Sequence, residues 1–182
     1  RKHFDSESPL LKHSILSIIN DLPQQNPPLL SKFLKIDERV ATFLLGGNTI
    51  DTRLQPFSRL IRPNIQFGDL VLPIEVINRI SVIARENFTN KNGLVFYFKG
   101  PYGVGKRSTA EAVCSELGGR LFIVEVNHLL SSEDTIFEKK INLILREAVL
   151  QESALYWNGF HNLLAEDKRT LLDKFMAELE AC

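Results

Sequence analysis

Three glycines and a lysine in the middle of the chain have the spacing of a loop that binds phosphate. Gly100, Gly105 and Lys106 fit the pattern G-x-x-x-x-G-K, and Gly103 lies between them. Glycines let such a loop curl so that its backbone N–H groups point toward phosphate oxygens, and the lysine reaches the outer phosphates. The stretch therefore predicts a nucleotide-binding P-loop. The alternative is a glycine-rich turn that only joins a strand to a helix.

The residues on either side of the loop indicate how the chain would position it. Five apolar residues at 94–98 precede it, as expected for a buried parallel strand, and apolar residues recur at helical spacing behind it, from Ala110 to Leu117. The N-terminal end of that helix would add its positive end to the site. The residues expected to contact a nucleotide are Gly100, Pro101, Tyr102, Gly103, Val104, Gly105, Lys106, Arg107 and Ser108.

The position after Lys106 departs from this kind of loop. Ser or Thr normally stands there because its hydroxyl binds Mg²⁺, but this chain has Arg107. Ser108 and Thr109 follow, yet each step along a helix turns the side chain by about 100°, so neither takes over the position. The sequence predicts no metal site. It leaves two roles open for Arg107: to replace the positive charge of Mg²⁺, or to face solvent or a neighbouring acid.

Hydrolysis would need further side chains at the tip of a neighbouring strand. An Asp there holds Mg²⁺ through water, and a Glu orients the attacking water. The third expected strand begins the stretch SALYWNGFH, and its tip reads Asn158-Gly159. An amide replaces a carboxylate poorly and glycine cannot act as a base, so we expect no catalytic residue here. The alternative is an active ATPase whose carboxylates come from elsewhere, such as Glu125 or Asp134.

Composition limits the class of protein. The 182 residues, 44% hydrophobic and 24% charged, are enough for one domain and a small partner domain. The 22 basic and 22 acidic residues balance, so neither nucleic acid nor an anionic membrane is expected as a partner. No run approaches the ~18 apolar residues of a membrane span, and Cys114 and Cys182 form no disulfide framework. We expect a soluble, cytoplasmic protein and, since the chain starts at Arg1, a fragment of a longer polypeptide.

The pattern along the chain predicts two domains. Residues 1–67 are expected to form a small, mainly helical domain, with helices at 9–19, 29–34, 38–45 and 52–61. Residues 68–182 are expected to form the nucleotide-binding domain, with an amphipathic helix from Pro73, strands at 94–98, 121–126 and 154–157, and helices after each strand. This alternation predicts an α/β fold with a parallel sheet between helices, whose ligands sit at the carboxyl ends of the strands.

Other side chains that could do chemistry have plainer interpretations. Tyr102, Trp157 and Cys114 are interpreted as packing residues, and His128 and His161 as surface or helix-cap residues. Charged positions are interpreted as solvated faces, namely Lys12, Lys35, Glu38, Arg39, Lys139, Lys140 and Arg146.

Two stretches, FYFKGPYGVGKRSTAEAV and SALYWNGFHNLL, resemble the AAA family of ATPases. The resemblance is to the first, divergent AAA module of tandem bacterial proteins, some of them encoded with phage-tail-like contractile injection systems. The stretch KIDERVATFLLGGNTIDTRL resembles the winged-helix-like region that precedes this module. The resemblance runs from Leu29 to the end of the chain. It implies five strands, the fourth between the first and third, of which this chain would contain a partial, truncated core.

The resemblance also implies which parts of the family's machinery remain. Gly100, Gly103, Gly105 and Lys106 match the phosphate loop, while three positions depart: the metal-binding hydroxyl (Arg107), the acidic metal organiser (Asn158) and the water-orienting glutamate (Gly159). It implies a module that binds ATP or ADP with little hydrolysis, as a regulatory or structural part of an ATP-driven remodelling machine. Its partners would be a second AAA module or further subunits, as in a ring. The alternative is an interaction scaffold with a vestigial loop.

Overall fold

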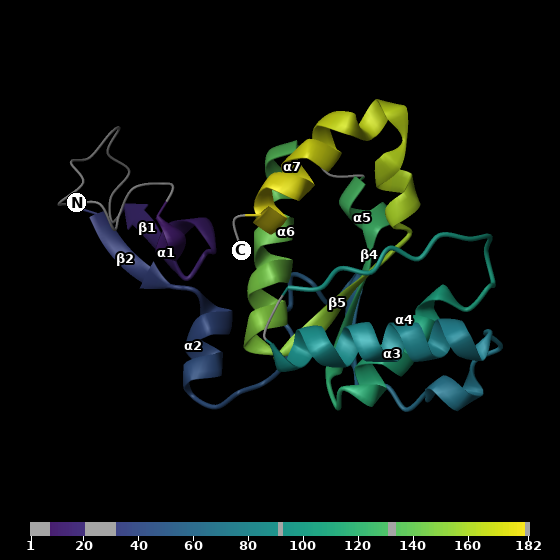
Figure 1. Cartoon of the computed structure of the whole chain (residues 1–182). Helices are drawn as coiled ribbons and strands as arrows, with labels where there is room; N and C mark the ends of the chain where they lie inside the picture. Colours follow the sequence, from purple (N-terminus) through teal and green to yellow (C-terminus); the bar gives the residue numbers. More distant parts are fainter. Residues whose placement is uncertain (1–7, 21–31, 91–92, 131–133, 181–182) are drawn as a thin grey trace.

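The chain folds into a three-stranded mixed sheet between helices, preceded by a small N-terminal region (Figure 1). This computed structural model describes residues 8–20, 32–90, 93–130 and 134–180. The α/β fold class expected from the sequence is confirmed. The elements are α1 (Pro9–Lys12), β1 (Leu16–Asn20), β2 (Lys32–Ile36), α2 (Glu38–Leu44), β3 (Ser58–Ile61), the 3₁₀ helix η3 (Phe67–Asp69), α3 (Ile74–Thr89), α4 (Lys106–Glu116), β4 (Arg120–Glu125), α5 (Val126–Leu130), α6 (Asp134–Leu150), β5 (Ser153–Asn158), the 3₁₀ helices η4 (Phe160–Leu164) and η5 (Glu166–Lys168), and α7 (Arg169–Glu180).

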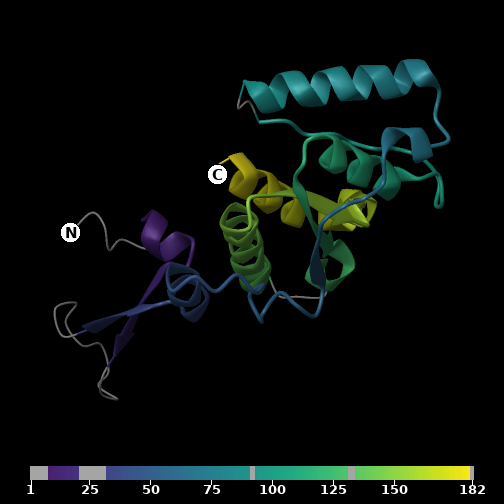
Figure 2. The ribbon, with the colours of Figure 1, turned by 90° about the horizontal axis from the view of Figure 1, so that it is seen from below.

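The central sheet has the order β3-β4-β5, with β4 parallel to β5 and antiparallel to β3. Because side chains alternate along a strand, β4 supplies both faces of the core. Phe122 and Val124 belong to an apolar cluster with α6 and α7, whereas Leu121 and Ile123 pack with α4. The sheet therefore separates α4 and the outer helix α3 from α6 (Figure 2). No helix in the described part of the chain is long and apolar enough to cross a membrane.

The N-terminal region contains a hairpin where the sequence predicted helix. α1 ends at Lys12, and β1 pairs antiparallel with β2, Leu16 opposite Ile36. The prediction of a helix over 9–19 is wrong because Ser14 takes a positive φ of 52° and the residues after it alternate between half-buried and exposed. The helix predicted at 29–34 begins outside the described residues, and β2 replaces its end. Only α2 was predicted correctly, with Asp37 capping it through the Arg39 N–H.

The segment that joins the N-terminal region to the sheet was also predicted as a helix, and this is wrong. Residues 52–57 form turns and β3 follows them. Pro56 explains the difference, since proline in the interior of a helix removes a hydrogen bond and clashes with the preceding turn. Leu54 and Phe57 are buried in the cluster on the α6 side. The connection therefore contributes to the core of the sheet domain.

The apolar residues before the loop do not form the expected buried strand. Residues 93–100 have no regular secondary structure, and Val95 is 88% exposed and Tyr97 59% exposed. The side chains still alternate in direction. The ring centroids of Phe96 and Phe98 are 5.8 Å apart in a stacked pair, and those of Tyr97 and Phe160 are 6.4 Å apart in an edge-to-face pair. An apolar run predicts a strand from composition, but a strand also needs a partner to hydrogen-bond with. Among the described residues, β5 pairs only with β4, so residues 93–100 have no strand with which to form a ladder of backbone hydrogen bonds.

The amphipathic helix α3 was predicted correctly in position but only partly in burial. It starts directly after Pro73, as expected. Ala84 is buried, yet Val76 of the same helix is 42% exposed. α3 packs on α4, where Arg85 of α3 pairs with Glu116.

Candidate functional site

The backbone of the predicted phosphate loop bends sharply into α4. Gly103 and Gly105 have φ values of +84° and +83°, which L side chains rarely adopt. Gly105 caps the start of α4, and its carbonyl oxygen accepts hydrogen bonds from the Thr109 N–H at 2.8 Å and from Thr109 Oγ1 at 3.0 Å. The two glycines are therefore needed for backbone conformation, as the sequence pattern predicted.

Lys106 folds back over the loop from the first position of α4. Its Nζ donates to the carbonyl oxygens of Gly100 at 2.8 Å and Pro101 at 2.6 Å. The loop is also tight at its base, because a Cβ added to Gly100 would lie 3.1 Å from Val104 Cγ2. The loop is thus curled around an ammonium group. These groups fit a polyphosphate, whose oxygens would compete with two carbonyls for the lysine.

Arg107 pairs with an acid of its own helix. Its Nε lies 2.7 Å from Glu111 Oε1, one helical turn further on, while 42% of the Arg107 side chain stays exposed. Of the roles that the sequence left open, this is the contact with a neighbouring acid. Thr109 does not replace the missing hydroxyl either, since its Oγ1 is bonded to Gly105. These residues do not fit Mg²⁺, because a guanidinium stands where the metal needs an oxygen ligand.

Tyr156 connects this end of α4 to the strand tips. It lies on β5 and packs with Ala110 and Cys114 in the apolar cluster on the α4 side. Burial raises the pKa of Tyr156, the positive charge of Arg107 opposes the shift, and the negative charges of Glu125 and Glu111 add to it. The charges of α4 and of the strand tips therefore act on the same side chain.

The tips of β4 and β5 carry one carboxylate and several amides. Glu125 and Asn158 are partners in the parallel register, and Asn158 Nδ2 donates to Glu125 Oε2 at 2.7 Å. Just beyond them, Asn162 Nδ2 donates to Asn127 Oδ1 at 2.6 Å. Among the described residues, no group of three or more His, Cys, Asp and Glu side chains could hold a metal ion. The tips thus offer a single carboxylate, and it is already hydrogen-bonded.

The remaining side chains singled out in the sequence have mixed outcomes. Tyr102 is fully exposed, so its interpretation as a packing residue is wrong. Trp157 packs edge-on against Phe175 at 4.9 Å, and Cys114 is buried, as predicted. Burial, with a contribution from Glu111, raises the pKa of Cys114 to about 11. His161 and His128 are both exposed, as predicted, and the His128 ring also stacks on Phe57.

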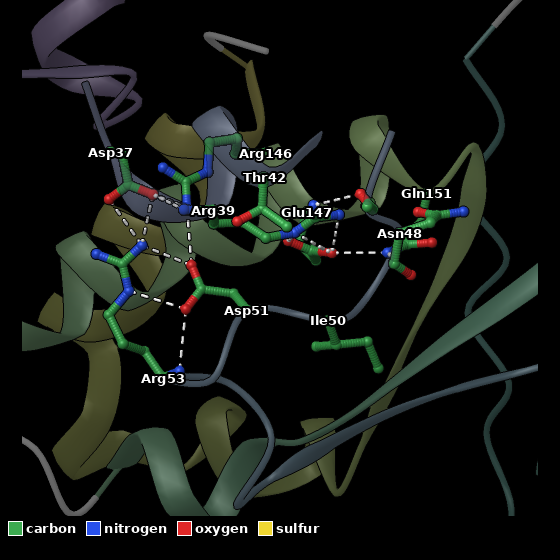
Figure 3. Close-up of polar contacts among 12 residues, drawn as sticks. Asp37, Arg39, Thr42, Asn48, Ile50, Asp51, Arg53, Arg146, Glu147 and Gln151 are labelled. Atoms are coloured by element: carbon green, nitrogen blue, oxygen red, sulfur yellow. Dashed lines mark hydrogen bonds and ion pairs between the residues drawn. The ribbon is translucent and has the colours of Figure 1, made fainter. Parts of the chain in front are cut away.

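A group of charges, most of them buried, was not found from the sequence. Arg39 and Arg146 were predicted to be solvated, but they are only 6% and 7% exposed. We call the group to which they belong the ion cluster, and Figure 3 shows its six members converging from α2, the 51–53 segment and α6: Asp37, Arg39, Asp51, Arg53, Arg146 and Glu147. The signal was the Arg146-Glu147 pair inside the apolar run of α6, where charges need buried partners.

Two contacts dominate the ion cluster. The Arg39 guanidinium binds both carboxylate oxygens of Glu147, with Nε–Oε2 at 2.8 Å and Nη2–Oε1 at 2.9 Å. Arg146 Nη2 binds Asp51 Oδ2 at 2.8 Å, and Arg53 binds the same carboxylate. Burial acts to raise the pKa of Asp51, but the hydrogen bonds and charge of Arg53, with the charge of Arg146, lower it overall. Asp51 in turn raises the pKa of Arg53.

A cleft of about 400 Å³ lies beside the ion cluster, and none of the phosphate-loop residues lines it. Its charged lining includes Lys35, Asp37, Asp51 and Arg53. Because acids and bases balance there, the cleft indicates no class of ligand.

Comparisons with known families match both parts of the chain. Residues 96–181 match the model of the ATPase family associated with various cellular activities (AAA), and residues 1–58 match the winged helix domain, variant. A comparison with curated proteins finds no match. The AAA match covers the phosphate loop and the strand tips, and it implies nucleotide binding. The two matches together support an AAA-family protein with a winged-helix region before its AAA part.

Proposed function

We propose that residues 100–108 bind ATP or ADP and that this module hydrolyses the nucleotide poorly. The observation that carries the proposal is the loop itself: two glycines with positive φ lead into α4, and the Lys106 ammonium lies inside the curl, 2.8 Å from the Gly100 carbonyl oxygen. This backbone supports phosphate binding because it combines a left-handed turn, a helix N-terminus and a lysine. The contacting residues remain those predicted: Gly100, Pro101, Tyr102, Gly103, Val104, Gly105, Lys106, Arg107 and Ser108.

Weak hydrolysis is supported by what stands at the catalytic positions. Asn158 donates a hydrogen bond where an acid would accept one, and Gly159 has no side chain to orient water. Removing one such group commonly costs ~10²-fold in rate, so the loss of both leaves little turnover. The pairing of Arg107 with Glu111 supports nucleotide binding without a metal requirement, since no hydroxyl ligand is present there.

The wider role follows from the resemblance and stays a proposal. We infer a regulatory or structural module of an ATP-driven remodelling machine, working with a second AAA module or with neighbouring subunits in a ring. A relationship to tandem bacterial proteins of contractile injection systems, and a cytoplasmic location, belong to the same prediction. The domain boundary at residue 67 is also a prediction, and the pairing of β3 with β4 means that the first domain would lend a strand to the second.

Calorimetric titration tests nucleotide binding directly. We expect heat from both ATP and ADP, with affinities that change less than about threefold when Mg²⁺ is chelated. Lys106→Ala should weaken binding by at least about tenfold, because a charge-assisted contact to phosphate is lost. Lys139→Ala, an exposed lysine of α6, is the matched control. Absence of heat with the wild-type chain would favour the scaffold alternative.

A second candidate, an active ATPase, is favoured by one observation: Glu125 places a carboxylate at the strand tip beside Asn158. In this case the wild-type chain would release phosphate, and Glu125→Gln would abolish the release while nucleotide still bound. Glu166→Gln, on the exposed η5 helix, controls for the change of charge. Absence of phosphate release from the wild-type chain would exclude this candidate. Release that Glu125→Gln leaves unchanged would exclude Glu125 as the carboxylate that carries it.

A further inference from the structure

The described N-terminal region, residues 8–20 and 32–45, rests on α6 and α7 through charged groups. Arg39 binds Glu147, and Arg146 binds Asp37 at 3.3 Å and the Ser14 carbonyl oxygen at 2.7 Å. A third contact joins Lys12 of α1 to Glu178 of α7 at 2.9 Å. In the described part of the chain, neither apolar cluster includes a residue of 8–45. Val40 of α2 is buried but belongs to neither cluster, so the contacts that join this region to α6 and α7 are mainly charge pairs.

The pairs are specific but contribute little net stability. Three guanidiniums face three carboxylates in the ion cluster, and the side chains of Arg39 and Glu147 are only 4% and 0% exposed. Removing such charges from water costs about as much as their attraction returns. Arg146 Nε is also buried without a hydrogen-bond partner among the described residues, which reduces the net stabilisation from these pairs further. If residues 8–20 and 32–45 move away, water can solvate both sets of charges.

The ion cluster extends to the sheet. Glu147 Oε1, which accepts from Arg39, also accepts from Gln151 Nε2 at 2.9 Å. Gln151 Oε1 in turn accepts from Arg120 Nη1 at 3.2 Å. Arg120 begins β4, and Gln151 lies just before β5. The hydrogen bonds of the ion cluster therefore continue to Arg120 and Gln151, at the ends of β4 and β5 opposite to Glu125 and Asn158.

We propose that the ion cluster is a latch, and that residues 8–20 and 32–45 alternate between a docked state and a released state. In the docked state Arg39–Glu147 and Arg146–Asp37 are paired. In the released state α6 presents Arg146 and Glu147 to solvent while the sheet stays folded. The latch does not depend on whether the loop at 100–108 binds nucleotide.

Hydrogen exchange of the full chain, followed by mass spectrometry, tests the latch. Arg39→Glu places a carboxylate against Glu147, so amides of 9–19 and 32–44 should exchange at least about tenfold faster, while those of β4 and β5 change less than about twofold. Arg79→Glu, the same change at an exposed helical arginine of α3, should leave both regions unchanged. The double variant Arg39→Glu/Glu147→Arg restores the opposite charges and should recover protection. Arg39→Gln/Glu147→Gln, which removes both charges, should open less than Arg39→Glu.

Three results would overturn the proposal. Arg39→Glu could leave the exchange of residues 8–20 and 32–45 unchanged, which would show that other contacts hold them. It could speed exchange in β4 and β5 equally, which would show that the two regions unfold as one unit. If the double variant folds without recovering protection, charge pairing does not determine docking. If that variant does not fold, Arg39→Gln/Glu147→Gln decides, and wild-type protection of the N-terminal region in this variant contradicts the latch.

Discussion

Asn158 and Glu125 are direct partners in the parallel register of β5 and β4, and the Asn158 amide donates a 2.7 Å hydrogen bond to the Glu125 carboxylate. The tip of β5 therefore stabilises a neighbouring charge. An acid at position 158 would instead repel it. The amide is thus suited to the residue across from it, which is a structural reason for its presence beside any functional one.

Asn158→Asp should destabilise the chain in a pH-dependent way. Two carboxylates would meet where a hydrogen bond now lies, so we expect a loss of about 2 kcal/mol in unfolding free energy at pH 7. The loss should shrink at acid pH, because protonation of either carboxyl removes the repulsion. Urea denaturation at several pH values measures this. Asn162→Asp, which faces the amide of Asn127, should show no such recovery.

Gly105→Ala should destabilise the loop through backbone strain alone. The residue has a φ of +83°, and an added Cβ would meet nothing within 4 Å. An L side chain in this conformation costs about 1–2 kcal/mol, and denaturant unfolding should give that loss. Gly93→Ala, where φ is not in the left-handed region and space is also open, should change stability by less than about 0.5 kcal/mol. Equal effects at the two positions would contradict the assigned loop conformation.

Asp51 should make stability depend on acid pH. The folded state lowers its pKa below 3.8, so between the two pKa values the unfolded state binds more protons. The stabilisation is complete above pH 3.8 and is lost as pH falls through the folded pKa. Asp51→Asn should cost about 3 kcal/mol at pH 7 and flatten the decline at acid pH. Asp173→Asn, on the exposed face of α7, should keep the wild-type decline.

Cys114 should be almost unreactive in the folded chain. Its pKa of about 11 leaves little thiolate near pH 8, and its exposed fraction is 6%. In a Cys182→Ser background, a thiol reagent should modify Cys114 at least about 100-fold more slowly than free cysteine. The rate should rise toward pH 11 and jump on unfolding. Modification at the rate of free cysteine in native conditions would show that the sheet does not cover this face of α4.

The sequence predicted best where the signal is local. Helices α4, α6 and α7 have long apolar periods, and β4 is a compact apolar run between a glycine turn and a polar segment. The loop glycines were found because their spacing reflects backbone conformation within a few residues. The strand tips could be located for the same reason, since each strand ends where its apolar run ends.

The failures share a dependence on distant residues. Leu16 and Ile19 fit helical spacing, but β1 forms because Ile36, in a later segment, pairs with it. Residues 94–98 have the composition of a strand and lack a ladder partner among the described residues. Arg39 and Glu147 lie 108 positions apart, so no local pattern could show that they would bury each other's charge.

The antiparallel pairing of β3 with β4 has a practical consequence for the expression of shortened chains. A shortened polypeptide that starts at residue 96, where the AAA match begins, would lack Ser58–Ile61 and also Leu54 and Phe57. One edge of β4 would then be unpaired, and its free amide and carbonyl groups can pair with strands from other molecules. Such a product is expected to precipitate, whereas a version starting upstream of Asp51 keeps this edge covered.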